Sequence, residues 1–398
     1  MKFLFVVLVI FVVVSPCICA RLLPYIIPSF NVLDYGAVGN GKNDETQAFV
    51  DAWKDTCSAI HDSPTLLIPK GKTFILQPLW FQGPCNSTTV YVKLEGTIKA
   101  PNKIEAWKWP NNNEKETWIR FSEINGLIIY GSGQIDGQGA PWWDCYSNTN
   151  CDRPTALHFH ACENLILRGL THINSPRNHI SLNACHGSHI SKLHIIAPNE
   201  SPNTDGIDIA ESSNVIIENS KMETGDDCIA INHGSSSINI IGIFCGPGHG
   251  ISVGSLGRNG ADESVENIYV RNCTFNGTTN GARIKTWMGG HGYARKVTFE
   301  DIIVIEAYNP VIIDQEYNPY DSVHAVKVSD VTFRNIRGTS ISKHAIQLNC
   351  DEAISCTNII LEGINITSSI GEEVHASCKN AKGMCTSCIP YVPCLSQE

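Results

Sequence analysis

The sequence predicts a single-domain, all-β solenoid in which short strands stack as a parallel β-helix. The 398 residues are 42% hydrophobic and 17% charged, a composition that excludes a disordered chain. Beyond about residue 120, a polar residue or Asn is repeatedly followed by alternating aliphatic residues and then a turn. This pattern is typical of short β-strands. The repeats are spaced by 25, 25, 23, 30, 29, 34 and 28 residues, with anchors at Leu165, Ile190, Val215, Ile238, Ile268, Val297, Val331 and Ile359.

The repeat length separates a solenoid from other all-β folds. Propeller blades need about 40–45 residues for four strands, so these repeats are too short for a propeller. A β-sandwich needs regular hairpin turns such as Asn-Gly, and the sequence does not show them. The Asn residues before the aliphatic runs, such as Asn164, Asn214 and Asn358, suit tight corners between strands. Stacked Asn side chains can also hydrogen-bond from coil to coil.

The open ends of a solenoid need covers. The segment from Thr46 to Ile60 predicts a short N-terminal capping helix, because its apolar residues share one helical face: Phe49, Ala52, Trp53 and Cys57. A Cys-rich cap at about residues 376–398 is expected at the other end. Its Cys385-Thr-Ser-Cys388 also resembles a redox or zinc motif, but local disulfides are favoured outside the cytosol.

Residues 1–20 have the pattern of a secretory signal peptide, which leaves residues 21–398 as the β-helix domain. Lys2 precedes an apolar run from Phe3 to Val14, and small residues follow up to Ala20. This run is shorter than the roughly 20 apolar residues of a membrane anchor, so we expect a secreted, extracellular protein without membrane association. The net charge of −10, without a block of Lys or Arg, argues against a nucleic-acid partner.

The predicted export agrees with the cysteine content. Of the 17 Cys, 15 remain after the signal peptide, so disulfides are expected and at least one thiol is left over. Five Asn-x-Ser/Thr triplets are candidate glycosylation sites, at Asn86, Asn199, Asn272, Asn276 and Asn365.

Polar residues recur at similar distances, 11 to 17 residues, after their repeat anchors. Similar offsets in successive coils place side chains on one face, about 5 Å apart per coil. Residues some 80 positions apart in the sequence are therefore expected to meet in one groove. The set is Asp205, Asp226, Asp227, His249, Arg283 and Lys285.

These residue types indicate hydrolysis of an acidic polysaccharide. Three carboxyl groups in one groove cannot all ionise at low cost, so one is expected to keep its proton. A protonated carboxyl beside an ionised one is the general acid and base arrangement of glycoside hydrolysis. Arg283 and Lys285 suit a substrate that carries its own carboxylate.

Four short motifs resemble those of the polygalacturonases, glycoside hydrolase family 28, in the style of the plant enzymes. They are Asn203-Thr-Asp-Gly-Ile-Asp, Gly225-Asp-Asp, Gly248-His-Gly and Arg283-Ile-Lys. The resemblance implies a right-handed parallel β-helix and inverting hydrolysis of α-1,4-linked galacturonan in cell-wall pectin. It implies no metal and no cofactor, and we expect a monomer whose partner is the pectin or polygalacturonate chain.

The resemblance also implies a role for each matching residue. Asp226 is expected to be the general acid, supported by His249, and Asp205 and Asp227 are expected to activate water. The expected substrate-binding residues are Arg283, Lys285, Tyr317 and Asn203.

Three other functions are compatible with parts of the sequence. Gly250-Ile-Ser252-Val-Gly254 matches a Gly-x-Ser-x-Gly esterase motif, but the following residues do not have a helical pattern. A calcium-dependent pectate lyase could use the acidic cluster for Ca²⁺. A non-catalytic pectin-binding wall protein could share the scaffold.

Overall fold

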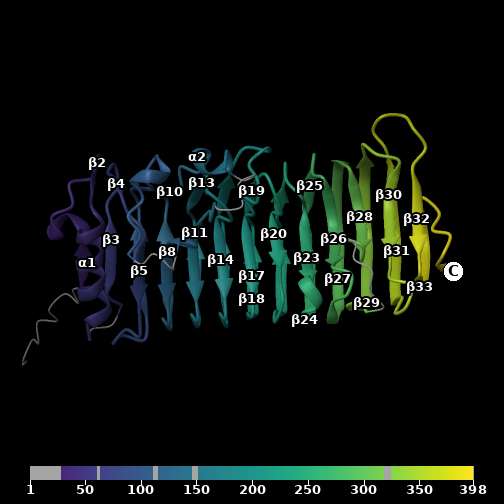
Figure 1. The fold of residues 1–398 in the computed structure, drawn as a ribbon, viewed down its shortest axis with the longest axis horizontal. Helices are drawn as coiled ribbons and strands as arrows, with labels where there is room; N and C mark the ends of the chain where they lie inside the picture. The colour runs from purple at the N-terminus through teal and green to yellow at the C-terminus, as the bar shows by residue number, and fades with distance from the viewer. Residues whose placement is uncertain (1–27, 61–62, 111–114, 146–150, 318–323, 398) are drawn as a thin grey trace, which may run out of the picture.

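Parallel strands stack along the whole length of the chain in the computed structural model, as the sequence predicts (Figure 1). The structure describes residues 28–60, 63–110, 115–145, 151–317 and 324–397. The predicted signal peptide, residues 1–20, lies outside the described residues. Within those residues, no helix has the length and apolar character needed to cross a membrane.

Each coil of the parallel β-helix contributes strands to three ladders, which we call ladders 1, 2 and 3. Ladder 3 carries the site described below. It is an 11-stranded parallel sheet that runs the length of the molecule (Figure 1). Its strands are β5 (Leu79–Gln82), β8 (Thr117–Ser122), β11 (Thr155–His160), β14 (Ile180–Asn183), β17 (Ile207–Ala210), β20 (Ile229–Ile231), β23 (Ile251–Leu256), β26 (Asn280–Thr286), β28 (Asn309–Asp314), β30 (His344–Asn349) and β32 (His375–Lys379).

Ladders 1 and 2 form the rest of the coil. In the N-terminal two thirds, ladder 1 consists of β1 (Ser29–Asn31), β3 (Thr65–Ile68), β6 (Val90–Leu94), β9 (Leu127–Gly131), β12 (Ile166–Arg168), β15 (His189–Ser191), β18 (Ser213–Glu218), β21 (Ser236–Ile241) and β24 (Asp262–Arg271). Ladder 2 consists there of β2 (Asn40–Asp44), β4 (Thr73–Ile75), β7 (Thr97–Lys99), β10 (Gln134–Asp136), β13 (Thr171–Ile173), β16 (His194–Ile196), β19 (Lys221–Glu223), β22 (Phe244–Cys245) and β25 (Thr274–Asn276).

The two ladders merge towards the C-terminus, because single long strands then span the corner between them. For example, β27 pairs with β24 through one part of its length and with β25 through another. The later strands are β27 (His291–Ala307), β29 (Lys327–Ser340), β31 (Cys356–Ser368), β33 (Ala381–Ile389) and β34 (Ser396–Gln397).

The strand register confirms the repeat anchors from Val215 onward and corrects one earlier anchor. Val215 pairs with Ile238, which pairs with Ile268, and the alignment continues to Ile359. Ile190, however, pairs with Leu167 and Ile217, so that anchor lies two residues too late in the chain. The position that precedes Val215 in this column is Ser188, a buried serine that interrupts the aliphatic pattern.

The predicted Asn corners are confirmed. Asn164, Asn214 and Asn358 have φ angles of 53°, 54° and 53°, in the left-handed region that Asn tolerates better than most residues. The side chains also bond between coils: Asn358 Nδ2 donates to Asp330 Oδ1 at 2.8 Å, and Asn164 Nδ2 donates to Asn125 Oδ1 at 2.9 Å.

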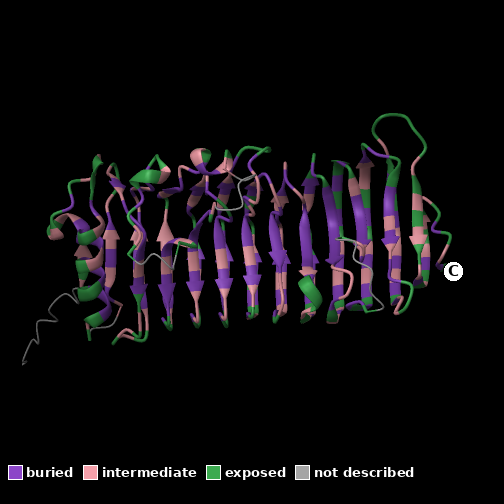
Figure 2. Cartoon of the chain, in the orientation of Figure 1, coloured by how far each residue is buried: buried purple, intermediate pink, exposed green. Residues whose placement is uncertain are grey.

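Inward-facing side chains fill the interior of the coil in columns. In β18, Val215 and Ile217 are buried while their neighbours are exposed or half-buried, and the same alternation marks most strands (Figure 2). Phe299 and Phe333 stack on successive coils with ring centroids 5.6 Å apart. Burial of apolar side chains in such columns is the main stabilising contribution.

The predicted N-terminal cover is present, and the stack ends in the Cys-rich segment. The capping helix α1 (Thr46–Ser58) ends two residues earlier than expected and buries Phe49, Ala52, Trp53 and Cys57 at the N-terminal end of the stack (Figure 1). At the other end, the Cys-rich segment forms β33 and β34 with disulfides Cys378–Cys394 and Cys385–Cys388. The remaining short helices are α2 (Ala140–Trp143), η1 (Val32–Tyr35), η2 (Ile104–Ala106) and η3 (Arg258–Gly260).

The cysteines agree with the prediction that at least one thiol is left over. The structure contains six disulfides in the described part of the chain, the other four being Cys57–Cys85, Cys145–Cys151, Cys228–Cys245 and Cys350–Cys356. Among the described cysteines, three thiols are free, and all three are buried: Cys162, Cys185 and Cys273.

Candidate active site

The candidate catalytic residues stand just before the strands of ladder 3. Ile207, Ile229 and Ile251 are aligned on β17, β20 and β23. Asp205, Asp227 and His249 each lie two residues before one of these isoleucines. The register of three successive coils therefore brings together side chains that are far apart in the sequence, as predicted.

Asp227 is the centre of a buried cluster of charges. Its Oδ1 accepts hydrogen bonds from Arg283 Nη2 at 2.6 Å and from Ser252 Oγ at 2.8 Å. Its Oδ2 accepts one from Lys285 Nζ at 2.8 Å. The Asp227 side chain is only 1% exposed, and the side chains of Arg283 and Lys285 are each 9% exposed. Charge-assisted contacts with so little solvent screening are strong, so this cluster is firmly held.

Strand alternation explains how two cations reach one carboxylate. Arg283 and Lys285 lie on the same face of β26, and Ile284 between them points into the fully buried core, as predicted. Burial lowers the pKa of Lys285, but the charge and hydrogen bond of Asp227, together with Tyr317, outweigh burial and raise this pKa overall.

Asp226 forms a second pair with His249. His249 Nδ1 and Asp226 Oδ1 are 2.8 Å apart, and Asn203 Nδ2 donates to Asp226 Oδ2 at 3.2 Å. Burial raises the pKa of Asp226, but the hydrogen bond and charge of His249 outweigh burial and lower it to about 2. The contact with the imidazole therefore favours the ionised form of the Asp226 carboxyl.

Two other carboxyls of the cluster have raised pKa values. Burial raises the pKa of Asp205 well above its usual value, and the charges of three neighbouring carboxylates raise it further. Burial also raises the pKa of Asp208 to about 7, although the charge of Arg177 opposes this. The expected sharing of one proton among Asp205, Asp226 and Asp227 is thus too simple, because Asp208 belongs to the same group.

Aromatic side chains border the cluster on its C-terminal side. Tyr317 is 43% exposed, and Lys285 Nζ lies 5.2 Å from the centroid of its ring. Trp287 lies next to Tyr317, with ring centroids 6.5 Å apart. An exposed aromatic face next to buried cations can contact the apolar face of a sugar ring, as the prediction for Tyr317 requires.

Sequence reasoning missed three residues that hold the site together. Ser252 bridges two predicted residues, because it donates to Asp227 and accepts from Arg283 Nε at 2.8 Å. Arg153 donates through Nη2 to Asn203 Oδ1 and so orients the amide that contacts Asp226. Asp208 is visible in the sequence as the last residue of the first motif, but its spacing alone gives it no role.

The geometry of Ser252 also argues against an esterase. The hydroxyl lies within strand β23 and is fully buried against Asp227 and Arg283. A nucleophile of the Gly-x-Ser-x-Gly type must instead stand exposed on a turn between a strand and a helix.

The cluster contains possible ligands for a cation, but the positive charges beside them oppose its binding. Asp226, Asp227 and His249 have possible ligand atoms within 4.8 Å of one another. Both Asp227 oxygens, however, already accept hydrogen bonds from Arg283 and Lys285. A divalent cation would have to displace these charged groups or approach them closely.

A groove of about 290 Å³ adjoins the cluster on its N-terminal side. It runs over β5, β8, β11, β14 and β17 to Asn232 after β20, and Asp208 lies near the end that faces the candidate carboxylates. Its charged and aromatic lining residues include Trp80, Arg120, His158 and Arg177. An elongated groove on this face can hold several units of a polymer.

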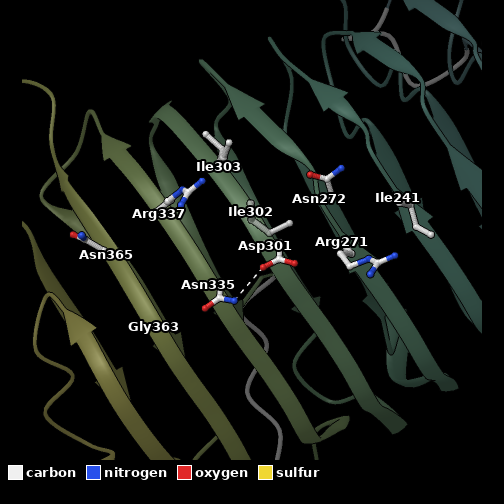
Figure 3. Close-up of a pocket in the computed structure, with 10 residues that line it drawn as sticks. All are labelled: Ile241, Arg271, Asn272, Asp301, Ile302, Ile303, Asn335, Arg337, Gly363 and Asn365. Atoms are coloured by element: carbon white, nitrogen blue, oxygen red, sulfur yellow. Dashed lines mark hydrogen bonds between the residues drawn. The ribbon is translucent and has the colours of Figure 1, made fainter.

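A larger groove, of about 580 Å³, lies on ladders 1 and 2 and contains none of the catalytic candidates (Figure 3). Arg271 and Arg337 line it, together with Asn335, whose Nδ2 donates to Asp301 Oδ1 at 3.1 Å (Figure 3). Two of the candidate glycosylation sites, Asn272 and Asn365, also line it. The candidate catalytic residues lie instead beside the strands of ladder 3.

Comparison with known proteins identifies the family of the chain. The model of glycosyl hydrolases family 28 matches residues 57–388. The chain belongs to this family of glycoside hydrolases. A probable polygalacturonase of Arabidopsis thaliana is 49% identical over 93% of this chain and 82% of its own length. A polygalacturonase of Cryptomeria japonica is 42% identical over 89% of this chain and 70% of its own length.

Among solved structures, the endo-xylogalacturonan hydrolase of Aspergillus tubingensis is similar, with a TM-score of 0.75 and 27% identity. The similarity covers 90% of this chain and 99% of the Aspergillus chain. The family 28 hydrolase described here therefore shares its scaffold with a xylogalacturonan hydrolase.

Proposed function

We propose that this family 28 hydrolase is a secreted polygalacturonase that cleaves α-1,4-galacturonosyl linkages of pectin with inversion. The observation that carries the proposal is a pair of adjacent carboxylates, each of which contacts different basic side chains. Asp226 contacts His249, whereas Asp227 is held between Arg283 and Lys285. Paired carboxylates in unlike environments suit general acid and base roles, and the two cations suit a uronate substrate.

In the proposed reaction, Asp226 protonates the oxygen of the leaving sugar while water attacks the anomeric carbon from the opposite side. The glycosidic C–O bond breaks, a new C–O bond to water forms, and the proton of the water passes to Asp205 or Asp227. The proton on Asp226 comes from His249 across their 2.8 Å contact. The raised pKa of Asp205, caused mainly by burial, makes it a strong base once it has lost its proton.

Three groups would hold the substrate in this scheme. Arg283 and Lys285 would share one galacturonate carboxylate beside the scissile bond, and Tyr317 would border the sugar that leaves. Asn203 would keep Asp226 oriented towards the glycosidic oxygen, since its amide contacts Asp226 Oδ2.

Chromatography of the products of polygalacturonate tests the proposal. We expect saturated oligogalacturonates or monomer, and proton NMR of fresh product should show the inverted anomer. Unsaturated products, or loss of activity with a chelator, would establish the lyase alternative instead. Absence of any turnover would favour a non-catalytic pectin-binding protein.

A second candidate substrate is a xylose-substituted galacturonan. Its support is the similarity to the Aspergillus endo-xylogalacturonan hydrolase, at 27% identity. Rates on xylogalacturonan and on unsubstituted polygalacturonate, measured side by side, distinguish the two. A faster rate on the substituted polymer would favour the second candidate.

The proposed site of action is the plant cell wall. Six disulfides in the described part of the chain suit an oxidising, extracellular compartment. Expression in a plant cell with a C-terminal fluorescent tag should place the protein outside the plasma membrane. Retention in the cytosol would contradict the proposed secretion.

A further inference from the structure

We infer that Asp208 acts as a neutral carboxylic acid that leaves the Arg177 guanidinium free to bind a substrate carboxylate. This inference rests on the proposed function, because it assigns a uronate-binding role to the groove beside the catalytic carboxylates. Asp208 and Arg177 are specificity residues in this scheme, and neither carries out the bond cleavage.

The fold places Asp208 at the junction of the groove and the catalytic cluster. On β17 it is aligned with Ser181 of β14 on one side and with Ala230 of β20 on the other. The same column continues to Ser252 and Arg283, which contact Asp227. A polymer that runs along ladder 3 from the groove to Asp227 therefore passes over Asp208.

The hydrogen bonds of Asp208 favour its neutral form. Asn178 is oriented by Thr155, whose Oγ1 donates to Asn178 Oδ1 at 3.0 Å, and its Nδ2 donates to Asp208 Oδ2. Asp208 Oδ1 is covered and has no hydrogen-bond partner among the described residues. A covered, unpartnered oxygen is much more costly in an ionised carboxylate than in a carboxylic acid. The raised pKa of Asp208, about 7 and caused mainly by burial, agrees with this geometry.

Some neighbouring charges favour the ionisation of Asp208 and others oppose it. Arg177 and Lys285 favour ionisation of Asp208, whereas Asp226 and Asp227 oppose it. An ionised Asp208 would in turn raise the pKa of Asp205 on the segment that leads into β17. The other titratable groups that line the groove are Glu116, Arg120 and His158.

Arg177 has the properties of a binding group. It is exposed, it lines the groove with Asp208, and it forms no ion pair within the described part of the chain. If Asp208 ionised, its charge would neutralise the guanidinium next to it and repel an incoming uronate. A neutral Asp208 leaves one full positive charge in the groove, where an overall acidic protein must attract an acidic polymer.

The test measures KM and kcat on polygalacturonate at pH 5 and pH 8 in the full-length wild-type protein and in Asp208→Asn. Asn has the shape of the neutral acid but cannot ionise. We expect the wild-type KM to rise about tenfold or more between the two pH values, the effect of losing one charge-assisted contact. In Asp208→Asn the ratio of the two KM values should fall to about two.

A second variant, Arg177→Gln, checks the same idea from the other partner. It should raise KM at pH 5 about tenfold and remove the further rise at pH 8, because no guanidinium remains to be neutralised. Arg337→Gln is the matched control, since it removes an arginine from the groove on ladders 1 and 2 and should leave both KM values unchanged (Figure 3).

Thermal unfolding gives a readout that is independent of turnover. The folded pKa of Asp208, about 7, lies above its usual 3.8, so its stabilising contribution is complete below about pH 3.8 and is lost as pH rises through 7. The melting temperature of Asp208→Asn should therefore fall less than that of the wild type between pH 5 and pH 8.

The outcomes separate this inference from the proposed function. Wild-type hydrolysis with the same KM ratio in Asp208→Asn, or an unchanged KM in Arg177→Gln, would overturn the inference alone. If the wild type failed to hydrolyse polygalacturonate at both pH values, the proposed function would fail, and the inference with it.

Discussion

Replacing Lys285 by Met should separate the binding of a uronate from the support of Asp227. Lys285 Nζ lies 2.8 Å from Asp227 Oδ2, and both side chains are almost completely buried. Met keeps the apolar stem but removes the charge. Loss of one charge-assisted contact to a substrate carboxylate is about 1.5–3 kcal/mol, or roughly 10–100-fold in kcat/KM.

The same substitution should also destabilise the fold, because Asp227 keeps only Arg283 and Ser252 as side-chain partners among the described residues. Breaking a buried ion pair by removing one partner costs about 3–5 kcal/mol. Urea unfolding would measure this loss. We expect it to lie at the lower end of the range, since Arg283 still neutralises the carboxylate at 2.6 Å.

The decisive assay compares kcat/KM on polygalacturonate and on a highly methyl-esterified pectin. The ester has no charge to pair with Lys285, so the variant should lose much more activity on the acidic polymer. Lys379→Met is a suitable control: Lys379 occupies the same column three strands further along ladder 3 and pairs with Glu316 at the surface. Equal losses on both polymers would show that Lys285 only supports Asp227, and the proposed carboxylate contact would be wrong.

Three further predictions concern the acid, the pH profile and the core. Asp226→Asn should lower kcat by about 10²–10⁴-fold without unfolding the protein, and wild-type turnover in that variant would reject Asp226 as the acid. The acidic limb of kcat/KM should lie above pH 3.8, because the pKa of Asp205 is raised above that value and the base must be deprotonated. An acidic limb below pH 3.8 would contradict the role of Asp205 as the base. Phe299→Ala should lower the free energy of unfolding by about 3–5 kcal/mol, since the ring is fully buried and stacked on Phe333. A loss below about 1 kcal/mol in urea unfolding would show that the column collapses around the cavity.

Much of the architecture could be predicted from the sequence, because solenoid folding repeats one local pattern many times. Val215 and the anchors after it carry aliphatic residues at each inward position, so period and register are both visible. The register could not be predicted at Ser188, where a buried serine occupies an inward position. The sequence pattern therefore assigns the start of this repeat to Ile190, the aliphatic residue two positions later.

The catalytic cluster was predictable for a similar reason, but its charge state was not. Similar offsets from the repeat anchors are enough to predict that Asp227 and Lys285 meet in one groove. Which oxygen meets which donor depends on side-chain geometry across several coils. The contact between His249 and Asp226, which lowers the pKa of Asp226 to about 2, has no counterpart in sequence spacing.

The position of the active site within the stack has a consequence for local opening of the native state. Each coil pairs only with its two neighbours, so a solenoid can lose structure progressively from its ends. The candidate catalytic side chains come from coils in the middle, with α1 at one end and the disulfide-bonded β33 at the other. Amide hydrogen exchange should therefore be slowest in β20 and β23, and the enzyme should keep its catalytic cluster assembled while its terminal coils fray.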